Sequence, residues 1–240
     1  MFDPAGPTFL ELMRQALAST ERGYDLLAPK FDHTPFRTPD AVLEVMAREI
    51  GGPRSIDRAL DVCCGTGAAM RHLRPLCREK VVGLDFSEGM LAEAERRLQG
   101  APGDARIELV RGDACELPFR SEMDVVTSVG AFGHIERDDE DRFVAGVVRA
   151  LRPGGRFVFA TGPMPRPNEP WFWMSHGFNA VMRVRNALLR PQFIMYYNTF
   201  TWPEVRPLLE RHGLSVEART GICPAPYERA AIVVATKGAR

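Results

Sequence analysis

The sequence has no run of apolar residues approaching the roughly 20 needed to cross a bilayer, so we expect no transmembrane helix. Its first twenty residues contain no basic segment followed by an apolar one, which argues against a secretory signal. Lys plus Arg equals Asp plus Glu, at 31 each, so no overall positive field attracts polyanions. This balance counts against a nucleic-acid substrate, although a local basic patch is compatible with it.

The cysteine pattern fits neither a disulfide framework nor a zinc site. An odd number of cysteines, two of them adjacent, does not predict paired disulfides, and there is no C-x-x-C pair. We therefore expect reduced thiols in a cytoplasmic protein. Carboxylates do not cluster along the chain either, and we predict no metal. The cysteines are Cys63, Cys64, Cys77, Cys115 and Cys223.

Short β-prone runs alternate with helical stretches through the middle of the chain, without repeats or low-complexity tracts. Alternation of this kind predicts an α/β fold with a doubly wound, mostly parallel sheet. Ser87 is expected to cap a helix that runs to about Leu98, and a second helix is expected over 138–151, broken by Pro153-Gly154-Gly155. The predicted strands are Arg58–Val62, Lys80–Leu84, Arg106–Val110, Met123–Val129, Arg156–Ala160, Leu214–Arg219 and Ala230–Thr236.

The remaining segments complete a single domain. Residues 1–55 are predicted to form a helical N-terminal cap before the core at 56–161, and 162–200 a long insertion after the fifth strand. Within 201–240, Thr201-Trp202-Pro203-Glu204 has capping-box spacing and predicts a helix start. The short link after the sixth strand leaves no room for a crossover helix, so the last two strands should pair antiparallel.

The main chemical signal is Leu60-Asp61-Val62-Cys63-Cys64-Gly65-Thr66-Gly67, where a strand gives way to a helix. Gly65 and Gly67 allow a sharp turn and a close approach of a ligand to the backbone, and ligands of open α/β sheets bind at such strand ends. A purely structural turn is the alternative. A dinucleotide is disfavoured, because Met70 stands where its fingerprint needs glycine or alanine and Asp61 would repel a pyrophosphate. Asp61 would instead favour an ammonium group.

Two further acidic residues follow later strands. Asp85 ends the second strand, where a carboxylate accepts hydrogen bonds from ribose hydroxyls; a residue that merely flanks a helix is the alternative. Asp113, in Gly112-Asp113-Ala114-Cys115, follows the third strand. An acceptor there, with the backbone amides beside it, would suit adenine. Aspartates at three successive strand ends are harder to explain as three unrelated turns.

Together, LDVCCGTG, VVGLDFSEGML, GDACELPF, MDVVTSVGAFGHI and RALRPGGRFVFA resemble the class I S-adenosylmethionine-dependent methyltransferases. The resemblance covers about residues 56–161, and less specifically 201–238. It implies seven strands with the last antiparallel, S-adenosylmethionine as cofactor, and a methyl-transfer activity. The first glycine usual in the family's turn is Cys63 here, which leaves slightly less room for the cofactor's carboxylate end.

The resemblance also implies residue roles. The motif of Asp61 contacts the methionine part, Asp85 the ribose, and Asp113 with its neighbours the adenine, while Ser128 lies beside the cofactor. Tyr24 resembles an N-terminal tyrosine that reaches the cofactor in relatives. The full set of expected cofactor contacts is Asp61, Cys63, Gly65, Thr66, Gly67, Asp85, Phe86, Met90, Asp113, Ala114 and Ser128.

His134 is the candidate general base, because it follows the fourth strand and imidazole titrates near neutral pH. A structural histidine is the alternative. His176, Tyr196 and Tyr197 are more typical of packing than of catalysis. The aromatic and methionine side chains of 171–197 predict either a lid over an apolar acceptor or ordinary core packing. The arginines at 183, 185 and 190 are a solvated face or meet an anionic acceptor or membrane surface.

We therefore predict an enzyme that methylates a small, partly apolar molecule. An RNA or protein methyltransferase would need an open basic cleft, which the neutral balance does not favour. A module that binds the cofactor without catalysis is a further alternative, and a nicotinamide oxidoreductase is the least favoured. The sequence does not indicate the acceptor atom or the oligomeric state.

Overall fold

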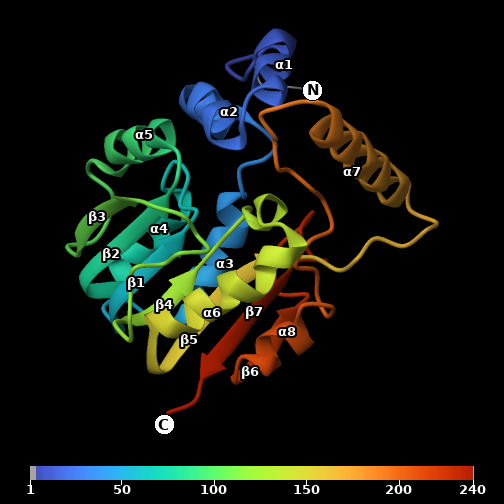
Figure 1. Cartoon of the computed structure of the whole chain (residues 1–240). Coiled ribbons are helices and arrows are strands. Elements are labelled where there is room, and N and C mark those ends of the chain that lie inside the picture. The colour runs from blue at the N-terminus through green and yellow to red at the C-terminus, as the bar shows by residue number, and fades with distance from the viewer. Residues whose placement is uncertain (1–3, 240) are drawn as a thin grey trace.

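A mixed sheet runs through the centre of the computed structural model, which describes residues 4–239 (Figure 1). Within these residues it has seven strands in the order β3-β2-β1-β4-β5-β7-β6. Neighbours from β3 to β5 are parallel, whereas β7 pairs antiparallel with both β5 and β6, which confirms the predicted fold. The strands are β1 Ile56–Val62, β2 Cys77–Asp85, β3 Arg106–Arg111, β4 Met123–Thr127, β5 Leu151–Thr161, β6 Leu214–Thr220 and β7 Ala231–Lys237.

Helices cover both faces of the sheet (Figure 1). On one face, α3 (Asp40–Ile50), α4 (Ala68–Leu73) and α5 (Glu88–Leu98) pack their apolar side chains against β1, β2 and β4. On the other, α6 (Glu140–Ala150) and α8 (Arg206–Arg211) enclose an aromatic core of Phe143, Phe157 and Phe159. The chain reverses its direction of winding between β1 and β4, and the ends of these two strands form the switch point where α/β folds bind ligands.

The N-terminal segment forms α1 (Phe9–Leu17), α2 (Thr20–Leu27) and the short 3₁₀ helix η1 (Ala28–His33) before α3. Asp25 of α2 accepts hydrogen bonds from the Ser87 hydroxyl (2.7 Å) and the Gly89 amide (3.0 Å), at the start of α5. A side chain at Gly89 would collide with the backbone of Asp25, at 2.8 Å from its Cα. The N-terminal helices are thereby held beside the end of β2.

The long insertion contains a helix of 19 residues, α7 (Pro170–Leu188). The segment after it returns along the N-terminal helices: the Thr20 amide donates to the Gln192 carbonyl (3.2 Å), and the Ile194 amide donates to the Thr20 hydroxyl (2.7 Å). In Figure 1, α7 lies beside α1 and α2 at one end of the molecule. Segments distant in sequence thus meet above the carboxyl ends of the parallel strands.

Two local predictions were wrong. Thr201 does not cap a helix, because α8 begins only at Arg206 with Val205 as its N-cap. The backbone around it is held elsewhere: the Trp202 amide donates to the Gly162 carbonyl (3.0 Å), and the Thr161 hydroxyl donates to the Phe200 carbonyl (2.8 Å). Pro153–Gly155 does not precede the fifth strand but lies within β5, where the register against β4 shifts.

Within the described residues, no helix combines the length and the apolar character required to cross a membrane.

Candidate active site

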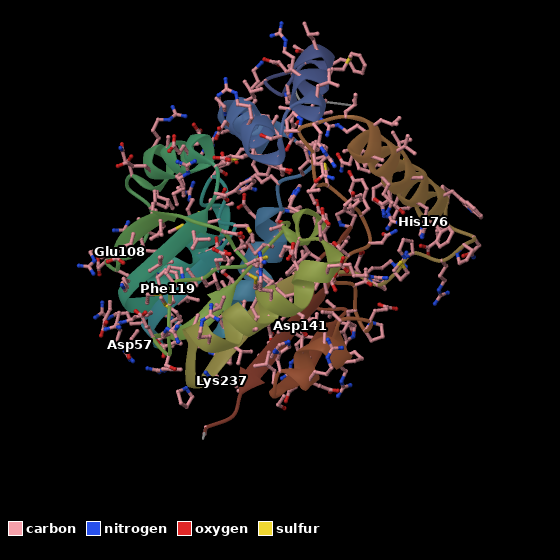
Figure 2. All side chains as sticks on the ribbon, in the orientation of Figure 1. Asp57, Glu108, Phe119, Asp141, His176 and Lys237 are labelled. Carbon is pink, nitrogen blue, oxygen red and sulfur yellow. The ribbon has the colours of Figure 1, made fainter. Side chains whose placement is uncertain are left out.

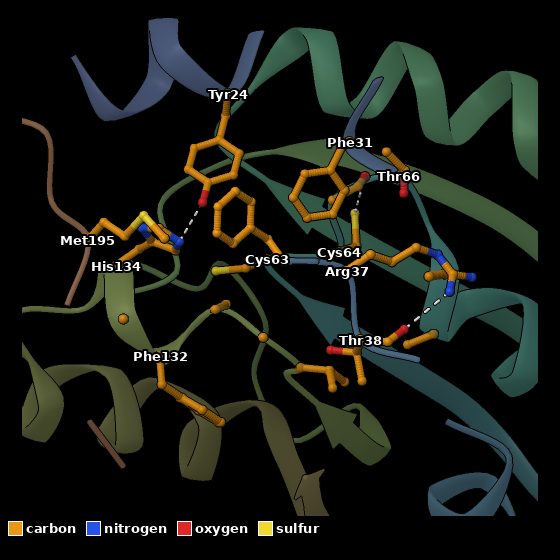
Figure 3. A pocket seen from close by; sticks show the side chains of 18 of the residues that line it. Tyr24, Phe31, Arg37, Thr38, Cys63, Cys64, Thr66, Phe132, His134 and Met195 are labelled. Atoms are coloured by element: carbon orange, nitrogen blue, oxygen red, sulfur yellow. Dashed lines mark hydrogen bonds between the residues drawn. The ribbon is translucent and has the colours of Figure 1, made fainter. Parts of the chain in front are cut away.

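A cavity of about 620 Å³ lies over the carboxyl ends of β1, β2 and β4 (Figure 3). Its walls come from the N-terminal segment, from the turn after β1, from the start of α5, from the loop after β4, and from the segment after α7. The two carboxylates of the lining, Asp61 and Asp85, lie at strand ends, and most of its aromatic side chains come from the N-terminal segment, the loop after β4 and the region of α7 with the segment after it. Of the predicted cofactor contacts, the lining includes Asp61, Cys63, Gly65, Thr66, Asp85, Phe86 and Met90.

The turn after β1 has three residues in the left-handed backbone region. Cys63, Gly65 and Gly67 have φ values of 57°, 52° and 82°. A Cβ on Gly65 would meet no protein atom within 4 Å, so this glycine leaves the backbone open to the cavity. Gly67 does not line the cavity; a side chain there would press on Leu98 at 3.0 Å, so its role is to let α4 pack on α5. Cys63 adopts the same conformation with a side chain, at a cost of about 1 kcal/mol.

Asp61 lies at the end of β1 with its side chain directed into the cavity. Its Oδ1 accepts a hydrogen bond from the Thr127 hydroxyl at 2.8 Å, and only 2% of the residue is exposed. Burial raises the pKa of Asp61 to about 7. Because burial disfavours the ionised carboxylate and the Thr127 hydrogen bond offsets this only in part, a cationic ligand beside Asp61 would stabilise its charge.

Asp85 ends β2 on the neighbouring wall. One carboxylate oxygen accepts the Gly65 amide (2.9 Å) and the other the Ser87 amide (3.0 Å), so the side chain ties the glycine turn to the start of α5. Burial raises its pKa as well, with the backbone amides opposing that shift. The carboxylate is fixed in position and retains lone pairs that can accept hydroxyl donors from a ligand.

The third acidic strand end differs from the first two. Asp113 and Ala114 lie outside the cavity lining, and the Asp113 side chain is 57% exposed. One of its oxygens accepts the Cys115 amide at 2.8 Å, which closes a turn. Ser128 also lies outside the lining; it is fully buried, and its hydroxyl has no hydrogen-bond partner among the described residues. The roles expected for these three residues remain predictions.

His134 and Tyr24 form a direct pair at the side of the cavity (Figure 3). The Tyr24 hydroxyl lies 2.7 Å from His134 Nε2, and His134 Nδ1 lies 2.6 Å from the Ile194 carbonyl oxygen. Burial lowers the pKa of His134 and raises that of Tyr24. The pair joins α2 to the loop after β4 and to the segment after α7, and both groups are neutral at neutral pH.

Sequence reasoning missed a polar group on η1 and the loop that follows it. Arg37 is the one Lys or Arg side chain of the cavity lining in the described part of the chain. It contacts Asp32 at 3.5 Å and Asp40 at 2.7 Å, and Asp32 in turn accepts the Thr66 hydroxyl at 2.6 Å. Pro35-Phe36-Arg37-Thr38 carries no motif, so only the folded chain brings Arg37 to the glycine turn.

The far side of the cavity is largely apolar and aromatic. Phe132, Trp171, Met195 and Tyr196 line it, with Tyr24 at its border. A second cavity of about 570 Å³ lies behind the segment 196–199, which forms a wall of both. His176, named above as a packing residue, lines this second cavity and is carried by α7 away from the strand ends (Figure 2).

The helix after the glycine turn packs closely on the sheet without the glycine that a dinucleotide fingerprint requires. Met70 is fully buried in α4. The room for it comes from Gly83 on β2, where a Cβ would lie 2.4 Å from the Met70 sulfur. In the dinucleotide pattern the small residue is on the helix. Here the helix carries the large Met70, and the small residue, Gly83, is on the neighbouring strand.

Comparisons with known proteins agree with this geometry. A family model described as a methyltransferase domain matches residues 59–155. A demethylmenaquinone methyltransferase of Desulfitobacterium hafniense is 36% identical over 115 residues, which cover 47% of this chain and 44% of that protein. Residues 59–155 are thus matched to a methyltransferase domain, and the comparisons with the strand order support a class I S-adenosylmethionine-dependent methyltransferase.

Two further methyltransferases are similar to this chain. A ubiquinone/menaquinone biosynthesis C-methyltransferase of Dinoroseobacter shibae is 33% identical over 145 residues, covering 59% of this chain and 55% of that one. A phosphoethanolamine N-methyltransferase of Haemonchus contortus, solved with S-adenosylmethionine, shares the fold with a TM-score of 0.61 and 19% identity, covering 82% and 52%. The chain spans about half the length of the first curated relatives it matches.

The methyltransferase cavity suits the family's cofactor, S-adenosylmethionine. Asp61 offers a buried carboxylate where an ammonium would be stabilised, and Gly65 leaves open backbone beside it. Asp85 presents fixed acceptor oxygens next to this backbone. These carboxylates and the open backbone therefore fit an adenosyl amino acid better than a diphosphate, which two carboxylates would repel.

Proposed function

We propose that this methyltransferase transfers a methyl group from S-adenosylmethionine to a small, quinone-like molecule in its reduced, hydroquinone form. The observation that carries the proposal is a single cavity with two unlike halves: carboxylates and open backbone at the strand ends, aromatic and apolar side chains opposite. The names of the similar demethylmenaquinone and ubiquinone/menaquinone methyltransferases support a flat, apolar acceptor.

We assign the polar half to the cofactor. Asp61 would hold its ammonium group, Asp85 its ribose hydroxyls, and Arg37, the cation of this lining, its carboxylate. Phe86 and Met90 would contact the adenosine from the start of α5. Asp113 and Ala114 lie outside the cavity lining and would reach the adenine from beyond its edge.

We assign the apolar half to the acceptor. Phe132 and Met195 would contact its ring, and Trp171, with Tyr196 and Tyr197, would exclude water from one side. Residues 162–200 would thereby act as the predicted lid. The cavity behind 196–199 offers space for an acceptor with a longer tail.

When bound, S-adenosylmethionine supplies a methyl group made electrophilic by its sulfonium. The chain's part is to align the acceptor carbon with that methyl group, which can lower the barrier by about 7–11 kcal/mol. In the proposed step the carbon–methyl bond forms as the sulfur–methyl bond breaks, which leaves S-adenosylhomocysteine and a methylated dienone. The ring carbon then loses its proton as the ring oxygen regains one, so the hydroquinone is restored and a single proton, the one taken from the hydroxyl, is released overall. The Tyr24 oxygen takes the proton of the acceptor hydroxyl while the Tyr24 proton passes to His134 Nε2.

The test is an assay with methyl-labelled S-adenosylmethionine and a panel of reduced and oxidised quinones that lack one ring methyl group. We expect label in the reduced acceptors, with one S-adenosylhomocysteine formed for each methyl transferred. Transfer to RNA or protein but to no quinol would contradict the proposed acceptor. Binding of S-adenosylhomocysteine without transfer to any acceptor would contradict the proposed activity.

A further inference from the structure

Most of the large apolar side chains that the described residues expose belong to two helices. Ten of the thirteen lie on α1 and α7, while the other three are Leu26, Leu189 and Ile222. Trp173, Val181 and Leu188 are 67%, 66% and 77% exposed. We call these ten residues the α1–α7 apolar face: Phe9, Leu10, Met13, Leu17, Trp171, Trp173, Met174, Val181, Val184 and Leu188.

Polar residues anchor the inner faces of both helices, and on α7 they lie beside Met182 and Phe178, which pack on the apolar cluster around Tyr24. The side-chain amide of Asn186 donates to the Phe193 carbonyl (2.9 Å) and accepts the Phe193 amide (3.0 Å). Asn179 makes the same double contact with Tyr197, at 2.9 and 2.8 Å. On α1, the buried residue is Gln15. Polar contacts thus hold the inner faces in place, while ten large apolar side chains of the two helices remain exposed on the outer faces.

The two outer faces lie at one end of the molecule. Arg185 of α7 donates to the Ala18 carbonyl at the end of α1 (3.2 Å), and the Thr20 amide donates to the Gln192 carbonyl. Figure 1 shows α1 and α7 side by side at the end above the strand tips. The two faces are therefore close enough to meet one flat partner together.

Positive charges predominate around this face, where the carboxylates of Glu11 and Glu169 are paired with Lys30 and Arg229. Residues 170–203 contain no Asp or Glu but include Arg183, Arg185 and Arg190. On α1, Arg14 is exposed, while Glu11 is paired with Lys30 at 2.8 Å. Among the described residues, Arg14, Arg183 and Arg190 form no salt bridge. Arg190 donates to the Asn186 carbonyl (2.8 Å) and Arg183 lies over the Tyr196 ring. An otherwise neutral chain thus places arginines that form no salt bridge among the described residues beside its exposed apolar residues, which complements an anionic apolar surface.

We propose that the α1–α7 apolar face docks on the surface of a bilayer that contains anionic lipid. Exposed Trp173 suits the depth at which tryptophan lies in membranes, and the arginines suit the headgroups. A second copy of this chain fits less well, because a symmetric contact would bring like-charged arginines together. Docking does not require methyl transfer, so it can fail or succeed independently of the proposed function.

The test is flotation of the full chain with vesicles of phosphatidylcholine plus phosphatidylglycerol, and with vesicles of phosphatidylcholine alone. We expect binding to the anionic vesicles that weakens with added salt. Each of Arg183→Gln and Arg190→Gln should lower the partition coefficient about fivefold. No binding, or equal binding to both kinds of vesicle, would overturn the proposal.

Val184→Glu and Leu188→Glu probe the apolar part. Both side chains are exposed, so these variants should fold and keep the thermal shift given by S-adenosylhomocysteine. We expect each to reduce vesicle binding at least about tenfold, while Ile222→Glu, at an exposed residue outside the face, binds as the parent does. Unchanged binding by both variants overturns the proposal. So does a dimer in sedimentation velocity that they dissociate without any vesicle binding.

Discussion

The Tyr24 hydroxyl lies 2.7 Å from Nε2 of His134, a residue 110 positions further along the chain. The direction of this hydrogen bond follows from the other ring nitrogen. The Ile194 carbonyl can only accept, so His134 Nδ1 carries the ring proton and Nε2 accepts from the Tyr24 hydroxyl. Both ring nitrogens of His134 are therefore engaged in hydrogen bonds, and the tyrosine oxygen is the atom that an acceptor would meet.

Tyr24→Phe should lower kcat for methyl transfer by about 10²–10⁴-fold, because the acceptor proton would lose its route to His134. The dissociation constant of S-adenosylhomocysteine should change little, since the aromatic ring is retained. Initial rates at saturating cofactor, together with titration calorimetry, measure the two quantities. Leaving His134 Nε2 without a partner should also cost about 1–3 kcal/mol of stability.

Tyr197→Phe is the matched control, because Tyr197 lines the same cavity and packs its ring on Trp171. It should retain nearly the parental kcat. Equal losses in the two variants, or full activity of Tyr24→Phe, would show that the Tyr24–His134 pair does not move the acceptor proton.

Cofactor affinity should depend on pH through Asp61. Burial raises the pKa of Asp61 to about 7, and an ammonium group beside it would favour the ionised form. Affinity for S-adenosylhomocysteine should therefore rise about tenfold between pH 6 and 8. In Asp61→Asn, binding should be weaker and this rise should disappear; an identical pH profile would exclude Asp61 as the titrating group.

The raised pKa of Asp61 also affects the stability of the ligand-free protein. Between about pH 4 and 7 the folded chain keeps a proton on Asp61 that the unfolded chain has lost, so stability from this residue falls as pH rises through that window. Denaturant titrations of the ligand-free protein should show the fall, and Asp61→Asn should reduce it. A parental slope in the variant would contradict the assignment.

Gly65→Ala should weaken S-adenosylhomocysteine binding by at least about tenfold. Its backbone has φ of 52°, and the new methyl group would project into the open cavity without touching protein. Gly154→Ala is the control, because Gly154 also has positive φ (76°) with open space around it but lies away from the cavity. Both variants should lose about 1 kcal/mol of stability, and only Gly65→Ala should lose affinity.

The sequence predicted the elements that depend on local signals. The mostly parallel sheet, the antiparallel last strand and the glycine turn follow from alternating patterns, link lengths and strand-end residues. The TWPE helix start was wrong, because Trp202 donates its amide to Gly162, a tertiary contact that local spacing does not reveal. The Tyr24–His134 pair and the approach of Arg37 to the turn depend likewise on contacts between distant segments.

Substitution of Arg37 tests the part of the site that the sequence motifs did not predict. Arg37→Gln should raise KM for S-adenosylmethionine about tenfold with little change in kcat, because it removes a binding contact present throughout the reaction. Asp40→Asn removes a partner of Arg37 but leaves its charge, so it should change KM far less. Equal effects of the two substitutions would indicate that the ion pair, rather than a contact with the cofactor, matters.

The most direct test of the account is the melting temperature of the parent and of Asp85→Ala with S-adenosylhomocysteine or NAD. At a concentration 100 times its Kd, S-adenosylhomocysteine should stabilise the parent by about 2.7 kcal/mol. For a chain of this size, that corresponds to a rise of about 5–10 °C. NAD should cause no shift, and Asp85→Ala should lose most of the response. A shift with NAD, or an undiminished response in Asp85→Ala, would contradict a cofactor held along the ends of β1 and β2.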